Sequence, residues 1–97
     1  VLNRGDRLIS CESIDSLLDG GKVTYIKMDV EGQEAQAIRG AENTIRKYRP
    51  KMCISAYHRS EDYFLIPELV YGIRSDYKIY MRHFPYVPAW DTSFYFI

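Results

Sequence analysis

The sequence lacks the short motifs that identify many enzyme classes. It contains no G-x-G-x-x-G dinucleotide fingerprint, no phosphate-binding P-loop, no G-x-S-x-G and no H-E-x-x-H. The chain therefore carries no phosphate or dinucleotide cradle, no serine-hydrolase nucleophile turn and no zinc-protease site of the common types.

Excess charge, long apolar runs and cysteines are also scarce. Thirteen basic residues balance thirteen acidic residues, so we expect no bulk attraction to nucleic acid or to an anionic membrane. No apolar run approaches the ~18 residues of a membrane helix, and no signal peptide is visible. The two cysteines, Cys11 and Cys53, lie far apart in apolar runs. This spacing predicts buried free thiols in a reducing, cytoplasmic compartment, with a disulfide between them as the alternative.

The length allows one domain with a thin core. A chain of 97 residues buries only about two-thirds of the surface that it exposes when unfolded. The sequence begins at Val1 rather than at a methionine, so we expect residues 1–97 to form a single partial domain. Nine Tyr and four Phe, most of them in the second half, favour core and edge packing in strands. A stacking platform for bases or sugars is the less favoured interpretation.

The hydrophobic pattern predicts an α/β fold. Helices are expected at 14–18, 33–48 and about 63–73, and strands at 7–11, 25–29, 52–57, 77–84 and 92–97. Pro67 falls inside the last helix, which predicts a separate first turn with Pro67 near the true helix start. Residues 25–57 form a βαβ unit, whose two strands are expected to be parallel. The last two strands are expected to form an antiparallel pair at a sheet edge.

Polar residues follow both strands of the βαβ unit. Asp29 and Glu31 come at the end of the first strand, and His58 ends the second. If these strands are neighbours, their backbones lie ~4.8 Å apart. A carboxylate could then orient the imidazole as a general base or share a metal site with it. The alternative is that Asp29 and Glu31 satisfy N–H groups at the helix start while His58 is a solvated strand end.

Three further side chains or pairs have structural and functional interpretations. Lys27 lies in a strand that is expected to be buried, so we predict that it pairs with Asp29 or with a carboxylate of a neighbouring strand. Arg82-His83 and Trp90-Asp91 are predicted to be a solvated strand edge and an aromatic plug, with a substrate-side wall as the alternative.

The co-occurring segments of the chain resemble one family. The run YIKMDVEGQE at 25–34 is followed by Ile38-Arg39-Gly40-Ala41 and Arg49-Pro50, and it is accompanied by segments 14–18, 56–58, 77–83 and 90–92. Together they resemble FkbM-type methyltransferases, whose pattern reads approximately I-K-x-D-x-E-G-x-E, L-x-G-A and R-P. That family's L-D-x-L-L segment precedes the pattern, and its A-Y-H, Y-K-x-Y-x-R-H and W-D-T segments follow it. The resemblance covers most of the chain from Ile14 onward.

The resemblance implies the C-terminal half of a class I methyltransferase that uses S-adenosylmethionine. It implies a Rossmann-like sheet of parallel strands with helices, ended by an antiparallel strand pair, and methylation of a hydroxyl on a sugar, polyketide or other secondary metabolite. The glycine-rich cofactor cradle and the acidic ribose-binding residue belong to the N-terminal half and are absent here. Many members also carry a glutamate where this chain has Ser55 and Ala56. No role of that carboxylate can be transferred to this chain.

The resemblance also suggests roles for the strand-end residues. His58 is the candidate general base, or Asp29 is the base and His58 orients it. Asp29 and Glu31 otherwise hold the acceptor or one edge of the cofactor, directly or through a cation, and no residue is assigned as a metal ligand. We expect a small-molecule acceptor such as a glycan, and neither nucleic acid nor membrane as a partner. Two alternatives stay open: a small metal-binding or hydrolytic α/β module built on the same three residues, and a non-catalytic module whose sheet edge pairs with another chain or with itself.

Overall fold

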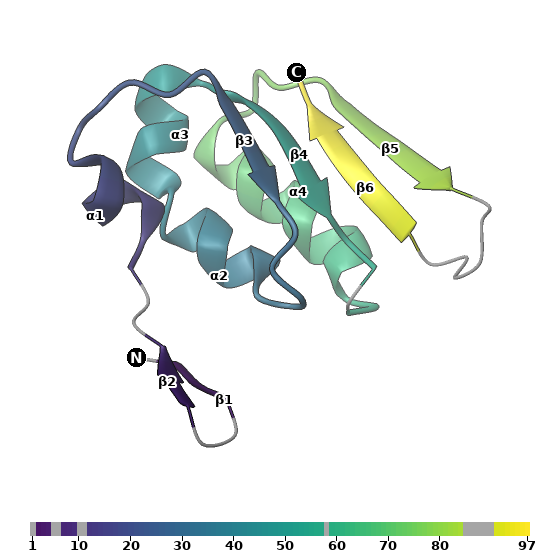
Figure 1. Ribbon diagram of the computed structural model, residues 1–97. Helices are drawn as coiled ribbons and strands as arrows, with labels where there is room; N and C mark the ends of the chain where they lie inside the picture. Colours follow the sequence, from purple (N-terminus) through teal and green to yellow (C-terminus); the bar gives the residue numbers. More distant parts are fainter. Residues whose placement is uncertain (1, 5–6, 10–11, 58, 85–90) are drawn as a thin grey trace.

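The chain forms a mixed sheet with helices packed on one side (Figure 1). A computed structural model of the protein describes residues 2–4, 7–9, 12–57, 59–84 and 91–97. The sheet contains β3 (Tyr25–Met28), β4 (Lys51–Ser55), β6 (Asp91–Phe96) and β5 (Ile79–Phe84), in that order. The helices are α1 (Ile14–Leu18), α2 (Glu34–Arg39), α3 (Glu42–Tyr48) and α4 (Asp62–Ile73).

The strand pairing confirms the predicted βαβ unit and the antiparallel closing pair. β3 and β4 are parallel neighbours, with Tyr25 opposite Lys51 and Met28 opposite Ile54. β6 pairs antiparallel with β4 on one side and with β5 on the other. The carboxyl ends of β3 and β4 therefore lie at the same edge of the sheet.

The N-terminal residues form a separate hairpin. β1 (Leu2–Arg4) and β2 (Arg7–Ile9) pair antiparallel in a two-stranded sheet, which Figure 1 shows apart from the main sheet. β2 confirms part of the strand predicted at 7–11. Residues 10 and 11, including Cys11, lie outside the described residues, so the predicted state of that thiol is untested. β1 has no counterpart among the predicted strands.

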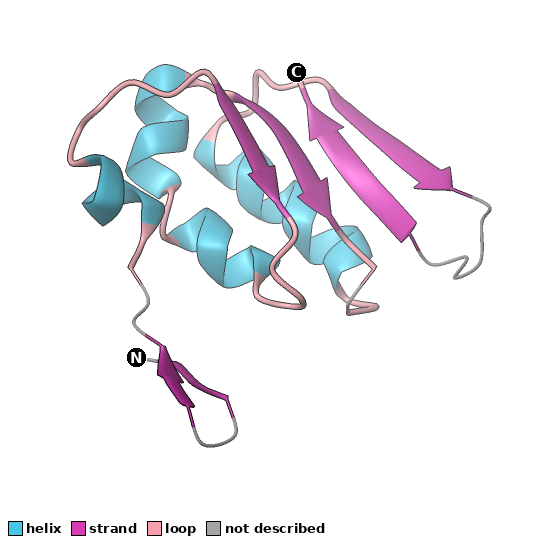
Figure 2. Cartoon of the chain, viewed as in Figure 1, coloured by secondary structure: helices cyan, strands magenta, loops and turns pink. Residues whose placement is uncertain are grey.

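The core lies between one face of the sheet and the helices α2, α3 and α4 (Figure 2). In β3 the core residues alternate with exposed ones, because successive side chains of a strand point to opposite faces, whereas residues 52–55 of β4 are all buried. The buried apolar core comprises Ile26, Met28, Ile38, Ala41, Ile45, Met52, Ile54, Ala56, Ile66, Val70, Tyr77, Phe94 and Phe96. No helix in the described part of the chain is long and apolar enough to cross a membrane.

The alternation in β3 corrects the prediction for Lys27. The strand is buried on only one face, so Ile26 and Met28 are buried while Lys27 is exposed. An exposed ammonium needs no buried carboxylate partner. Val30 lies beyond the strand and is 41% exposed.

The single helix predicted at 33–48 is in fact two helices. α2 ends at Arg39 and α3 begins at Glu42, so the chain bends at Gly40 and Ala41. The cause is the start of α1, which packs against the bend. A Cβ on Gly40 would lie 3.0 Å from the Ser13 Cβ, and the Gly40 carbonyl accepts a hydrogen bond from the Asp15 N–H at 2.9 Å. This long-range contact replaces bonds that a continuous helix would make.

The predicted separate turn before Pro67 is also wrong. α4 runs continuously from Asp62 to Ile73 with Pro67 inside it. Ile66 and Val70, on the buried side of α4, are fully buried against the sheet. This burial offsets the backbone hydrogen bond that a proline removes from a helix interior.

Candidate active site at the carboxyl ends of β3 and β4

The turn between β3 and α2 has an unusual backbone. Glu31 and Gly32 both have positive φ values, 53° and 96°, and the Gln33 N–H closes the turn onto the Val30 carbonyl at 3.2 Å. Glycine adopts this left-handed region without steric cost, but a residue with a Cβ loses roughly 1–2 kcal/mol there. The turn thus holds Glu31 in a costly conformation.

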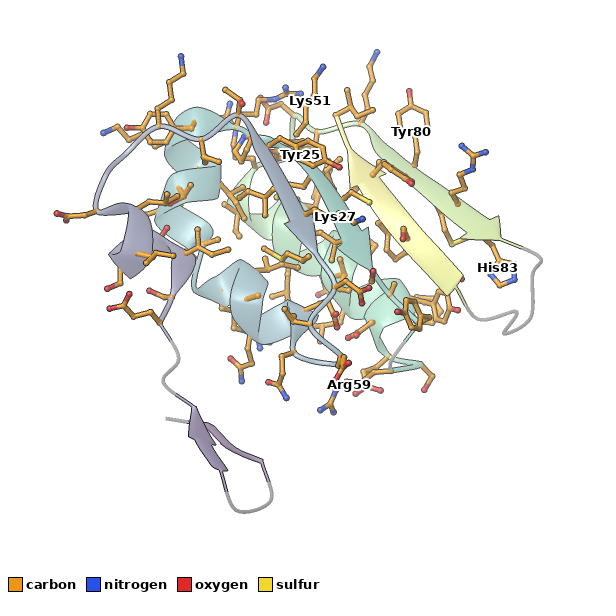
Figure 3. The ribbon with its side chains drawn as sticks, viewed as in Figure 1. Tyr25, Lys27, Lys51, Arg59, Tyr80 and His83 are labelled. Carbon is orange, nitrogen blue, oxygen red and sulfur yellow. The ribbon has the colours of Figure 1, made fainter. Side chains whose placement is uncertain are left out.

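A buried carboxylate stabilises this turn from inside. Glu34 is fully buried, and its two carboxylate oxygens accept hydrogen bonds from the Val30 N–H at 2.7 Å and the Gly32 N–H at 3.0 Å. From the end of β4, Arg59 Nε donates to the Gly32 carbonyl at 2.8 Å (Figure 3). These two turn amides are therefore bound by Glu34. The structural alternative had predicted that Asp29 and Glu31 bind the N–H groups at the helix start. Sequence reasoning placed Glu34 only in the first turn of a helix.

Asp29 contacts the neighbouring strand end through a tyrosine. The Tyr57 hydroxyl donates to the Asp29 carboxylate, with oxygen–oxygen distances of 3.2 and 3.4 Å. His58, the predicted partner of Asp29, lies outside the described residues, so this pairing is untested. Sequence reasoning missed Tyr57. The signal was its alternation with Cys53 and Ser55, which places Tyr57 on the same side of the sheet as Asp29.

A cavity of about 630 Å³ opens beside the turn. It is lined by Glu12, Ser13, Ile14, Asp29, Val30, Glu31, Gln33, Gln36, Ala37 and Gly40. The structure therefore brings Asp29 and Glu31 to one cavity. The lining has three carboxylates and no basic side chain, which suits a ligand rich in hydroxyl or cationic groups. Among the described residues, no group of three or more His, Cys, Asp or Glu side chains could hold a metal ion.

The α1 wall of this cavity is fixed by Asp15. Its carboxylate accepts hydrogen bonds from the N–H groups of Asn43 and Thr44, at 3.0 and 2.8 Å, and from the Thr44 hydroxyl at 2.6 Å. Asp15 thereby caps the start of α3 across the bend. Burial raises the pKa of Asp15, but the hydrogen bonds from Thr44 and Asn43 outweigh it, so the pKa lies below its ordinary value.

Arg82 and His83, for which a substrate-side wall was the alternative interpretation, do not line this cavity. His83 is exposed on β5, and its Nδ1 lies 2.6 Å from the Thr92 hydroxyl oxygen. The Tyr63 hydroxyl donates to the same oxygen at 3.3 Å. Trp90 lies outside the described residues.

Comparisons with known proteins identify the family. The model of the Methyltransferase FkbM domain matches residues 3–85. A crystal structure of Methyltransferase FkbM from Methylobacillus flagellatus KT is 45% identical, with a TM-score of 0.78 over 87% of this chain. No match was found among proteins of curated function. The chain belongs to the FkbM methyltransferase family, and its sheet and helices share the fold of that structure. It spans only 22% of the chain of that structure.

Proposed function

We propose that this chain is the C-terminal part of an S-adenosylmethionine-dependent methyltransferase that methylates a hydroxyl group of a sugar or secondary metabolite. The observation that carries this proposal is the β3–α2 turn, which presents Asp29 and Glu31 to a cavity at the carboxyl end of β3, a strand that pairs in parallel with β4. Open α/β sheets bind their ligands at this edge. The family match gives the reaction class, and the turn gives the place where this chain would contribute.

The residues present fit one edge of the cofactor site. Carboxylates lining a cavity can accept hydrogen bonds from hydroxyl groups and neutralise an amino group, so Asp29 is the candidate cofactor-binding residue. The sequence has no glycine-rich cradle. We therefore infer that a further segment completes a Rossmann-like sheet beside β3, an edge strand of the described sheet. When bound, the cofactor supplies a methyl group that its sulfonium already activates.

The chemistry left to this chain is to position the acceptor hydroxyl and to remove its proton. Asp29 can accept that proton, and the hydrogen bond from Tyr57 fixes the orientation of its carboxylate. His58, known here only from the sequence, remains the other candidate base. Glu31, held by the turn, would bind the acceptor.

The remaining expectations belong to the same proposal. The acceptor would be a small molecule such as a glycan, with no role for nucleic acid or membrane. Cys53 is a buried free thiol, which suits a reducing compartment and a cytoplasmic location. The edges of the sheet could also support self-association of the isolated chain.

A methyl-transfer assay on the full-length protein tests the proposal. We expect Asp29→Asn and His58→Ala to lower the transfer of radiolabelled methyl from S-adenosylmethionine to a panel of sugar and polyketide acceptors. Loss of the base should cost about 10²–10⁴-fold in rate. Glu68→Gln, an exposed residue of α4 outside the site, is the matched control. Unchanged rates in both site variants would exclude both candidate bases.

Binding measurements separate the competing functions. Calorimetric titration should show S-adenosylmethionine binding by the full-length protein and much weaker binding by the 97-residue chain. Tight Mg²⁺ binding by the 97-residue chain would instead support a metal-binding module. Binding of neither ligand by the full-length protein would favour an interaction module.

A further inference from the structure

β5 forms an open edge of the sheet in the described part of the chain. It pairs with β6 on one side only, and Figure 1 shows it at the end of the sheet opposite to β3. The further segment inferred above lies beside β3, so it leaves the edge at β5 open. An edge strand presents backbone N–H and C=O groups that can pair with another strand.

The pairing with β6 determines which backbone groups of β5 point outward. Just before β5, the N–H and C=O groups of Lys78 both bond to Ile97, at 2.8 and 2.9 Å. Positions that bond to the neighbouring strand alternate with positions that do not along an antiparallel ladder, so Tyr80 and Arg82 also face β6. The outward N–H and C=O groups of β5 therefore belong to Ile79, Met81 and His83.

The same edge carries exposed apolar side chains. Ile79 and Met81 point to the helix side of the sheet, because they lie opposite the core residues Phe96 and Phe94. They are nevertheless 36% and 61% exposed. A cavity of about 500 Å³ opens beside Ile79. It is lined by Pro67, Glu68, Tyr71, Gly72 and Ile79. Outward backbone groups beside an apolar surface favour another β-strand as the occupant.

Charge selects the register in which two copies of β5 can pair antiparallel. A pairing centred on Tyr80 places Lys78 opposite Arg82 of the second copy, and a pairing centred on Arg82 places the two Arg82 side chains opposite each other. Like charges directly opposite are destabilising. A pairing centred on Met81 avoids both contacts. It places Arg82 opposite Tyr80 of the second copy, where the guanidinium can lie against the aromatic ring.

We propose that the full-length protein forms a two-fold symmetric dimer in which the β5 strands of two copies pair antiparallel, with Met81 on the axis. In this register Ile79 lies opposite His83 of the second copy, so all the outward N–H and C=O groups from Ile79 to His83 gain partners. The inference rests on the proposed function for the place of the further segment beside β3. It goes beyond that function because it assigns a partner, one edge of the sheet and one register.

Single cysteine variants of the full-length protein test the register. Residues of a hydrogen-bonded antiparallel pair have Cα atoms ~5.5 Å apart, which a disulfide can span. After mild oxidation, we expect Met81→Cys to form several-fold more disulfide-linked dimer on non-reducing gels than Tyr80→Cys or Arg82→Cys. The wild type, with its two cysteines, gives the background. Linkage mainly through Tyr80→Cys or Arg82→Cys, or no linkage above the background, would overturn the register centred on Met81.

Sedimentation equilibrium of the full-length protein tests the dimer itself. Met81→Lys places like charges at the axis and should raise the dimer Kd by more than about ten-fold. Met81→Pro removes an outward N–H but no bond to β6, so it should weaken the dimer while the strand is kept. Leu17→Lys is the matched control, because Leu17 is an apolar residue of α1 that is 69% exposed. A monomeric wild type, or a dimer Kd that neither Met81 variant changes, would overturn the proposal.

The two proposals can fail separately. A dimer linked through Met81→Cys in a full-length protein that binds no S-adenosylmethionine would support the β5 interface and contradict the proposed function. A monomeric protein that binds S-adenosylmethionine and transfers its methyl group would do the reverse.

Discussion

The two ends of the β3–β4 pair use charged side chains in different ways. At the amino ends, Asp76 accepts hydrogen bonds from Arg74, at 2.9 and 2.7 Å, and from Arg49 at 3.1 Å. Arg74 also donates to the Arg46 carbonyl at 2.7 Å, and the Arg49 guanidinium lies 4.9 Å from the centre of the Tyr77 ring. This cluster joins the ends of α3 and α4 to the start of β5.

At the carboxyl ends, the structural and exposed carboxylates are separate residues. Glu34 is buried and binds the backbone of the turn, whereas Asp29 and Glu31 line the cavity. Charge alone does not distinguish a carboxylate that holds the fold from one that faces a ligand. Burial and the identity of the hydrogen-bond donors do, because backbone donors fix a turn while a cavity leaves room for another molecule.

The largest expected effect is at Glu34. Glu34→Ala leaves the partly buried N–H groups of Val30 and Gly32 without this acceptor, and a buried unsatisfied group costs about 1–3 kcal/mol. We expect the free energy of unfolding to fall by about 3 kcal/mol, measured by urea denaturation. This prediction tests whether side-chain hydrogen bonds stabilise the carboxyl end of the β3–β4 pair as they do the amino end.

Two further variants control that measurement. Glu34→Gln keeps one carbonyl oxygen and should cost less than the alanine variant. Glu68→Ala removes an exposed glutamate of α4 and should change stability by less than about 0.5 kcal/mol. If Glu34→Ala unfolds at the wild-type urea concentration, the turn does not depend on its buried carboxylate.

A medium effect is expected at the α1 wall of the cavity. Asp15→Ala removes the side-chain cap of α3, and caps of this kind contribute about 0.5–2 kcal/mol. Because the pKa of Asp15 is lowered in the folded protein, its contribution is present above about pH 4 and is lost as the pH falls further. The difference in Tm between wild type and Asp15→Ala should therefore be larger at pH 7 than at pH 3. Ser16→Ala, which changes the next residue of α1, is the control. A Tm difference between wild type and Asp15→Ala that is larger at pH 3 than at pH 7 would contradict the capping role of Asp15.

The smallest effect is expected in the exposed cluster at the amino ends. Hydrogen bonds from Arg74, together with the charges of Arg74 and Arg49 and against a desolvation cost, lower the pKa of Asp76 to about 2. The lowered pKa makes Asp76 stabilising above about pH 4, and this contribution is lost between about pH 4 and pH 2. Asp76→Asn should remove that part of the pH dependence of the Tm. Because the pair is exposed, added salt should reduce the difference.

An identical fall in Tm for wild type and Asp76→Asn over this pH range would assign no role to the cluster. The comparison of the two ends would then rest on burial at Glu34 alone.

The sequence predicted the parts of the fold that depend on local pattern. The strands predicted at 25–29 and 52–57 overlap β3 and β4, and the βαβ pattern between them predicted their parallel pairing correctly. The break at Gly40 was missed because its cause, the contact with Ser13 and Asp15, lies more than twenty residues away. Lys27 was misplaced because parallel strands are usually covered on both faces, whereas β3 buries only Ile26 and Met28 in the described part of the chain.

The candidate site was predicted in outline only. Asp29 and Glu31 were singled out because they follow the first strand of the βαβ unit, and both line one cavity. The clamp by Glu34 depends on a left-handed turn at Glu31, and no residue pattern requires a glutamate to adopt that backbone. The contact of Asp29 with Tyr57 depends on the register of β3 and β4, which emerges only when the two strands pair.

The strand order also has a consequence for synthesis on the ribosome. β6 lies between β4 and β5 in the sheet but follows both of them in the chain. During translation, β5 therefore has no strand to pair with until β6 has emerged, and its backbone N–H and C=O groups remain available to other chains. The nascent protein passes through an interval in which β5 is the segment most exposed to misassembly.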